Sequence, residues 1–186
     1  MSRQKKTLAV LKSLNELYPD ARLELNYGNG FELLVAVILS AQCTDERVNQ
    51  VTAKLFKKYT TPQDFIEVPQ EELEQEIRPT GFYRNKAKLL KACFQKLQQE
   101  FNGELPRDIE QLVKFPGVGR KTAAMVLGNA FGIQQGIAVD THVKRVANRL
   151  KLSDSAEIDQ IEAELIKEIP QADWTQFSNA AILFGR

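Results

Sequence analysis

Apolar residues recur every three or four positions along most of the chain, which is the spacing of one face of an α-helix. The segment from Thr7 to Tyr18 places large apolar side chains on one face and ends at Pro19-Asp20. The segment from Phe31 to Ala41 is apolar almost throughout, and its length favours a buried helix over a strand. No segment alternates convincingly with the period of two that a half-buried strand requires. The pattern therefore predicts an all-α protein.

Residues that favour helix starts divide the chain further. Thr44 is a favourable N-cap, because its hydroxyl can accept a hydrogen bond from the first turn and two acidic residues follow it. Asp140 or Thr141 can cap another helix in the same way. Further helix starts are expected at Pro62, Pro69, Ser153 or Ser155, and Asp173.

Charge is unevenly distributed along the sequence. The span 64–76 is acidic, so we expect it to face away from any phosphate backbone. Positive charge follows Gly81-Phe82-Tyr83, on a predicted helix that keeps apolar residues on its other face. The cations of this helix are Arg84, Lys86, Lys88 and Lys91. A solvated helical face explains such a run more simply than a nucleic-acid site does.

A glycine-rich corner, Phe115 to Ala123, joins two helical segments. The first segment, Pro106 to Lys114, is predicted to be a helix that Pro116 cannot continue. The two glycines of the corner permit backbone angles that a side chain would forbid. The second helix then starts with amides that suit a phosphate, and those expected to point outward belong to Val118, Gly119 and Arg120. An ordinary helix turn with a glycine cap would give the same local pattern.

Two side chains near these helix starts could carry chemistry. Lys121 lies in the first turn after the corner, where a cation is electrostatically unfavourable, so it could serve as a nucleophilic amine. Asp140 could stabilise positive charge that develops at a sugar C1′ when a glycosidic bond breaks. Each residue also has a simpler interpretation, as a solvated lysine and as a helix N-cap. His142 is expected to be structural or to contact phosphate, because no nucleophile is paired with it.

Composition narrows the class of protein. The 186 residues are 43% apolar, enough for a folded core, and a net charge of +1 gives no overall basic signal for nucleic acid. Cys43 and Cys93 lie far apart and the chain has one histidine, so we expect no zinc site, no disulfide framework and a reducing environment. The N-terminal stretch has no unbroken apolar core of signal-peptide length, and no apolar run in the sequence approaches a membrane span, which predicts a soluble, cytoplasmic protein.

Several motifs occur together in one order: Ser40-Ala41-Gln42-Cys43-Thr44-Asp45, Gly81-Phe82-Tyr83-Arg84-Asn85-Lys86-Ala87, Phe115 to Ala123, and Ala138-Val139-Asp140-Thr141-His142-Val143. With them, residues 8 to 186 resemble endonuclease III, a bifunctional DNA glycosylase and AP lyase of base excision repair. The corner itself is similar to the helix-hairpin-helix motif, which grips the DNA backbone. Lysine at position 121 favours the lyase branch, because the related adenine glycosylases typically lack it.

The resemblance implies an all-α fold of two lobes with DNA bound between them. Residues 23–133 would form a six-helix bundle lobe that carries the hairpin, and residues 1–22 and 134–186 a second helical lobe. The implied substrate is duplex DNA that contains oxidised or ring-damaged pyrimidines, which are flipped into a pocket. The implied protein is nucleoid-associated and monomeric.

The resemblance also implies roles for individual residues. Lys121 would attack C1′ and form a Schiff base, after which β-elimination cuts the strand, and Asp140 would be the assisting carboxylate. Gln42 matches the side chain that fills the gap left by the flipped base, and Phe82 matches a second wedge position that is usually aliphatic. The residues expected to contact DNA are Gln42, Phe82, Gly117, Val118, Gly119, Arg120, Thr141 and His142.

The sequence departs from the family pattern in two places. The segment from Lys121 to Asp140 is longer than usual, and Gln134-Gln135-Gly136 is expected to absorb the difference in a loop. Endonuclease III commonly ends in a Cys-x6-Cys-x2-Cys-x5-Cys loop that holds an iron–sulfur cluster, whereas this sequence stops at Phe184-Gly185-Arg186. Either this member has no cluster or the chain has been cut, and we expect no cofactor and no metal. The rival interpretation is a non-catalytic hairpin protein that binds DNA, against which the pair of Lys121 and Asp140 argues.

Overall fold

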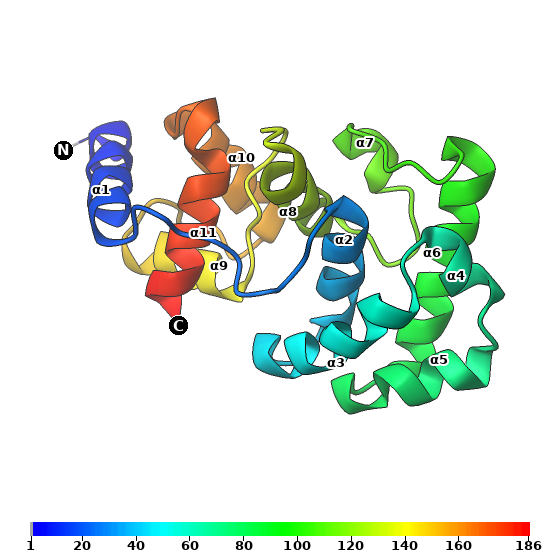
Figure 1. Ribbon diagram of the computed structural model, residues 1–186. Helices are drawn as coiled ribbons and strands as arrows, with labels where there is room; N and C mark the ends of the chain where they lie inside the picture. Colours follow the sequence, from blue (N-terminus) through cyan, green and yellow to red (C-terminus); the bar gives the residue numbers. More distant parts are fainter. Residues whose placement is uncertain (1) are drawn as a thin grey trace. The chain divides into compact units, whose positions relative to one another are not determined.

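The computed structural model describes residues 2–186, and its regular structure there is entirely helical (Figure 1). These residues form eleven α-helices, α1 to α11, and two short 3-10 helices, η1 and η2, with no β-strand among them. The all-α prediction is therefore confirmed. None of the helices described is long and apolar enough to cross a bilayer.

Two compact units make up the chain. The continuous unit comprises Glu24–Val126, and the terminal unit combines the residues up to Leu23 with Leu127–Arg186. The boundary after Val126 falls inside helix α8 (Arg120–Phe131), so this helix begins in the continuous unit and ends in the terminal unit. The family resemblance places that boundary later, after residue 133.

The continuous unit is built around helix α6 (Tyr83–Phe101), which packs against α4 and α5 (Figure 1). The rings of Phe31, Phe65 and Phe94 meet in its core with centroids 5.0–5.5 Å apart. Its other helices are α2 (Gly30–Leu39), α3 (Asp45–Lys58), α4 (Pro62–Glu67), α5 (Gln70–Ile77), η1 (Arg78–Thr80) and α7 (Ile109–Leu112). The unbroken apolar sequence of α2 is matched by its burial, since every residue from Leu33 to Leu39 is buried.

Local capping decides where helices of this unit begin. The Thr44 side chain accepts an amide hydrogen bond from the first turn of α3, which confirms the predicted helix start. The Asp108 side chain accepts a hydrogen bond from the Gln111 amide and fixes the start of α7. Helix α7 is only four residues long, so the prediction of a helix over the whole of Pro106 to Lys114 is wrong.

The terminal unit is organised around helix α11 (Trp174–Gly185), which packs against both α1 (Arg3–Leu17) and α9 (Thr141–Arg149) (Figure 1). Helix α10 (Ile158–Glu168) packs against α1 and α9, and η2 (Gln171–Asp173) leads into α11. The helix after Asp173 starts where the sequence predicts it.

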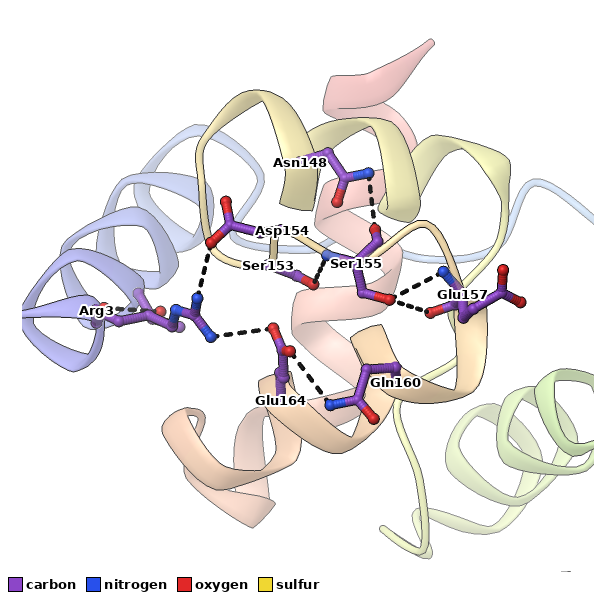
Figure 2. Close-up of polar contacts among 9 residues, drawn as sticks. Arg3, Asn148, Ser153, Asp154, Ser155, Glu157, Gln160 and Glu164 are labelled. Carbon is purple, nitrogen blue, oxygen red and sulfur yellow. Dashed lines mark hydrogen bonds and ion pairs between the residues drawn. The ribbon is translucent and has the colours of Figure 1, made fainter.

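Helix α1 starts earlier than the apolar pattern predicts. The Ser2 hydroxyl accepts an amide hydrogen bond from the first turn, so the helix begins at Arg3 rather than at Thr7. The guanidinium of Arg3 then pairs with Asp154 at 3.0 Å and with Glu164 at 3.1 Å (Figure 2). Exposed ion pairs stabilise a fold little, but these two link α1 to α10 and to the loop before it.

The loop before α10 uses its serines differently from the prediction. The Ser155 amide donates to the Ser153 hydroxyl at 3.1 Å, and the Ser155 hydroxyl accepts from the Glu157 amide at 3.0 Å (Figure 2). These bonds stabilise the loop itself, and the helix begins only at Ile158. The prediction that Ser153 or Ser155 starts the helix is therefore wrong.

Candidate functional site

The corner between α7 and α8 is held by its own backbone and by one aromatic anchor. The Phe115 amide donates to the Leu112 carbonyl at 3.0 Å, and the Val118 amide donates to the Phe115 carbonyl at 3.1 Å. The Phe115 side chain is buried, and its ring centroid lies 5.5 Å from that of Phe101 near the end of α6. The backbone hydrogen bonds of the turn and the buried Phe115 side chain thus hold the corner in one conformation.

The two glycines of the corner are glycine for different reasons. Gly117 has φ 79°, in the left-handed region that side chains rarely adopt, so the turn itself requires glycine. Gly119 has no such backbone angle, is exposed, and would place a Cβ with no atom within 4 Å. Folding therefore does not require glycine at 119, whereas close approach by an external group would.

The amides of the corner differ in part from the sequence expectation. The Val118 amide is used inside the turn and does not point outward, because it bonds to the Phe115 carbonyl. Within the continuous unit, the exposed residues Gly117 and Gly119 have amides without a hydrogen-bond partner. They lie at the start of α8, where unpaired N–H groups and the helix dipole favour an anion. The side chain of Arg120 pairs with Glu110 at 3.3 Å and so connects this helix start to α7.

Lys121 follows in the first turn of α8 and is partly exposed. Within the continuous unit, its side chain makes no hydrogen bond or ion pair. Its amine is therefore not committed to a structural role there, which is what a nucleophile requires.

Gln42 and Phe82 are exposed residues of the continuous unit with left-handed backbone angles, a conformation that Asn102 at the end of α6 also adopts. Gln42 follows α2 and has φ 53°, and Phe82 follows η1 and has φ 47°. Such angles are costly for residues other than glycine and persist only where the surrounding structure enforces them. Phe82 also leaves 66% of its surface in solvent, so packing within the chain does not explain a large apolar residue at this place.

The cationic run on α6 is not the solvated face that the sequence indicates. Lys86 is 3% exposed, and its amine donates to the carbonyls of Leu39 at 2.8 Å and Thr80 at 2.7 Å. Lys91 is partly buried and donates to the Ile66 carbonyl at 2.7 Å, near the end of α4. The prediction is wrong for these two lysines because each aliphatic stem reaches carbonyls that a helix end leaves unpaired. Of the run, the exposed cations are Arg84 and Lys88.

Asp140 caps α9, as predicted, and Thr141 does not. One carboxylate oxygen, Oδ1, accepts hydrogen bonds from the amides of His142 and Val143, each at 2.8 Å. The second oxygen, Oδ2, takes no part in this cap. Lys121 belongs to the continuous unit and Asp140 to the terminal unit.

The buried segment before Asp140 is anchored by two side chains that the sequence analysis missed. The Ile137 amide donates to the Glu162 carboxylate at 3.3 Å, and the Ala138 amide donates to the Ser178 hydroxyl at 3.1 Å. Both acceptors are buried, on α10 and α11. Glu162 stands next to core positions of an amphipathic helix, and this is the sequence signal that could have indicated its burial. The sequence does not show its partner, which lies 25 residues away in the chain.

His142 contacts its own unit. Its Nδ1 lies 3.2 Å from the Gly185 carbonyl oxygen and 3.2 Å from the Arg145 guanidinium. A protonated Nδ1 donates to the carbonyl, and an unprotonated Nδ1 accepts from Arg145. The neighbouring Thr141 is exposed.

The two cysteines do not fit an iron–sulfur cluster. Such a cluster is commonly held by four thiolates. Burial raises the pKa of the Cys93 thiol to about 12, and Cys43 is only half-buried in a loop. Residues 2–186 contain no group of three or more His, Cys, Asp or Glu side chains placed to bind a metal ion.

One protein-family model and several individual proteins are similar to this chain. The model of the HhH-GPD superfamily base excision DNA repair protein matches residues 35–171. Endonuclease III of Synechocystis sp. is 47% identical over all of this chain and 84% of its own length. Endonuclease III of Bacillus subtilis is 48% identical over 95% of this chain and 80% of its own length. The Escherichia coli K12 enzyme is 43% identical over 97% of this chain and 85% of its own length.

Solved structures agree with this similarity. A non-covalent endonuclease III–DNA complex has a TM-score of 0.94 and 48% identity, and it covers 99% of this chain and 86% of its own. A trapped endonuclease III–DNA covalent intermediate has the same scores. A thermostable thymine-DNA glycosylase shares the fold at a TM-score of 0.83 with only 21% identity. The chain belongs to the HhH-GPD superfamily of base excision DNA repair proteins and, within it, to the endonuclease III family.

Proposed function

We propose that this DNA glycosylase and AP lyase removes oxidised pyrimidines from duplex DNA, with Lys121 as the nucleophile and Asp140 as the assisting carboxylate. The observation that carries the proposal is the uncommitted amine of Lys121 in the first turn of α8, directly after the exposed amides of Gly117 and Gly119. A phosphate bound at those amides would hold the DNA backbone within reach of the amine.

The chemistry follows from a neutral lysine amine. Lys121 attacks C1′ of the damaged nucleoside, the bond from C1′ to the base breaks, and the base leaves with the bonding electrons and gains a proton. The attached nitrogen then loses a proton, the bond from C1′ to O4′ breaks as the sugar ring opens, and O4′ takes up a proton, which gives a protonated imine between Lys121 and C1′. Loss of a proton from C2′ then expels the 3′ phosphate by β-elimination, and water releases the enzyme.

Asp140 supports the first of these steps. Its Oδ1 is occupied by two amide hydrogen bonds, which fix the carboxyl group, while Oδ2 remains available. A fixed negative charge stabilises the positive charge that develops on the sugar as the base departs. The same side chain thus serves as helix cap and as electrostatic partner.

The comparisons support an enzyme over a non-catalytic DNA-binding protein. A relative with 48% identity has been trapped as a covalent intermediate with DNA, and an imine is an intermediate that can be trapped.

We also propose that Gln42 and Phe82 act as wedges, because both are exposed and held in left-handed loop conformations. An inserted side chain offsets part of the few kcal/mol that unstacking a base costs.

A panel of duplexes tests the substrate class. Each duplex carries one defined base, either an oxidised pyrimidine, an oxidised purine or an undamaged base, and reactions contain a metal chelator. We expect base release and strand cleavage with oxidised pyrimidines and little with the other duplexes. Preferential release of the oxidised purine would overturn the proposed substrate class while leaving the lyase chemistry intact.

We further propose that residues 2–186 hold no iron–sulfur cluster, because their two cysteines do not fit one. Purified protein of this sequence should be colourless. Visible absorbance with stoichiometric iron would contradict the proposal.

A further inference from the structure

Lys86 is the most buried cation of the continuous unit, and its two partners lie at two separate helix ends. Leu39 is the last residue of α2, and Thr80 is the last residue of η1. One amine nitrogen donates to both carbonyls, at 2.8 Å and 2.7 Å, so the two helix ends are held close to each other.

The chain that leaves each of these helix ends leads within a few residues to a proposed wedge. Gln42 follows Leu39, and Phe82 follows Thr80. Both wedges have left-handed backbone angles, which need support from the structure around them. We propose that Lys86 is a positioning residue that sets the spacing of the wedges Gln42 and Phe82.

This proposal rests on the proposed wedge function, and the electrostatics of the site agree with it. The C-terminal end of a helix carries partial negative charge, so a cation placed there is favourable. Hydrogen bonds from a charged donor are also stronger than neutral ones. Burial lowers the pKa of Lys86, and the nearby Cys43 side chain opposes that shift. Cys43 directly follows Gln42, so its thiol is a natural reporter on this loop.

The same helix supplies a matched control. Lys91 also lies on α6 and also donates to backbone carbonyls, including those of Ile66 and Val68. Its partners lie at the end of α4 and beyond it, away in sequence from both wedges. Lys86→Met and Lys91→Met therefore both remove hydrogen bonds from a lysine amine to backbone carbonyls. Only Lys86→Met removes them next to the loops that carry Gln42 and Phe82.

The primary measurement is the single-turnover rate on two substrates, a duplex with a paired lesion and a duplex with a preformed abasic site. We expect Lys86→Met to slow excision of the paired lesion by about 100-fold, the effect of a displacement of roughly 1 Å in a reacting site. Cleavage at the abasic site should fall much less. Lys91→Met should change both rates by the same small factor. Equal behaviour of the two variants would overturn the proposal.

A double-mutant cycle separates positioning from a merely structural role. If Lys86 acts through the wedge, Lys86→Met combined with Gln42→Ala should be no slower than the slower single variant. If the double variant instead shows the product of the two single rate losses, the proposal is overturned. If Gln42→Ala alone slows both substrates equally, the wedge function fails instead, so the two failures are distinguishable.

A thiol measurement reports on the loop without DNA. Cys93 is fully buried, whereas Cys43 is half-buried. Alkylation of Cys43 should be several-fold faster in Lys86→Met than in Lys91→Met, at equal circular dichroism. If Lys86→Met does not fold, Lys86→Gln keeps a neutral N–H donor group without the charge, and its alkylation and excision rates decide the matter in the same way. Unchanged alkylation in the folded variant would count against the proposal.

Discussion

Replacing Gly119 by alanine should separate folding from DNA binding. The residue does not have the positive φ that disfavours side chains, and a Cβ there would meet no atom within 4 Å. A compatible Gly→Ala change stabilises a protein by about 0.4–1 kcal/mol, because it restricts the unfolded chain. The added methyl group would instead stand where a phosphate approaches the amide. Losing one hydrogen bond to a charged group costs about 1.5–3 kcal/mol, which corresponds to about 10- to 150-fold in affinity.

Gly117→Ala should lower the stability of the fold, whereas Gly119→Ala should not. Its φ of 79° makes a side chain unfavourable, so alanine should cost about 1–2 kcal/mol of stability. Gly132→Ala is the control for that strain, because Gly132 also has a positive φ, at 67°, with open space around a Cβ, but lies outside the corner. It should lose similar stability and keep DNA affinity.

Urea denaturation and fluorescence anisotropy with a labelled abasic duplex, at one fixed salt concentration, measure the two effects. The expected result for Gly119→Ala is equal or higher stability together with weaker DNA binding. A Gly119→Ala protein that binds DNA as tightly as the parent would refute the assignment of this amide to phosphate.

Three other substitutions test neighbouring parts of the account. Gln42→Ala should slow excision of a paired lesion more than cleavage at a preformed abasic site in single-turnover assays, and equal losses would reduce it to a loop residue. Asp140→Asn keeps a cap but removes the charge, so base release should slow by about 100-fold or more, with unchanged thermal unfolding. Glu162→Leu leaves the buried Ile137 amide without this acceptor, so urea denaturation should report a loss of about 1–3 kcal/mol; an unchanged midpoint would show that the bond contributes little.

Features with local causes could be predicted from the sequence. Asp140 and Thr44 cap their helices because a side-chain oxygen can reach an amide two or three residues later without any distant contact. The turn at Gly117 needs a positive φ, and glycine between two helical segments signals it. The apolar run of α2 predicts its burial for the same local reason.

Features with distant causes could not be predicted. The sequence alone does not distinguish Lys86 from a surface cation, because its partner Leu39 lies 47 residues away in the chain. Glu162 reads as a polar residue of an amphipathic helix, although it bonds to Ile137. The outward direction expected for the Val118 amide is wrong, because only the folded turn shows that the Phe115 carbonyl accepts from it.

The central claim is that Lys121 forms the covalent link to DNA. Borohydride reduces an imine to a stable bond, so a duplex with an abasic site can be trapped on the protein, and the linked peptide can be mapped by mass spectrometry. We expect the link on Lys121, no adduct in Lys121→Gln despite near-normal DNA binding, and normal trapping in Lys114→Gln, an exposed lysine that directly precedes the corner. A Lys121→Gln protein that still forms the adduct, or a link mapped to another amine, would contradict the account.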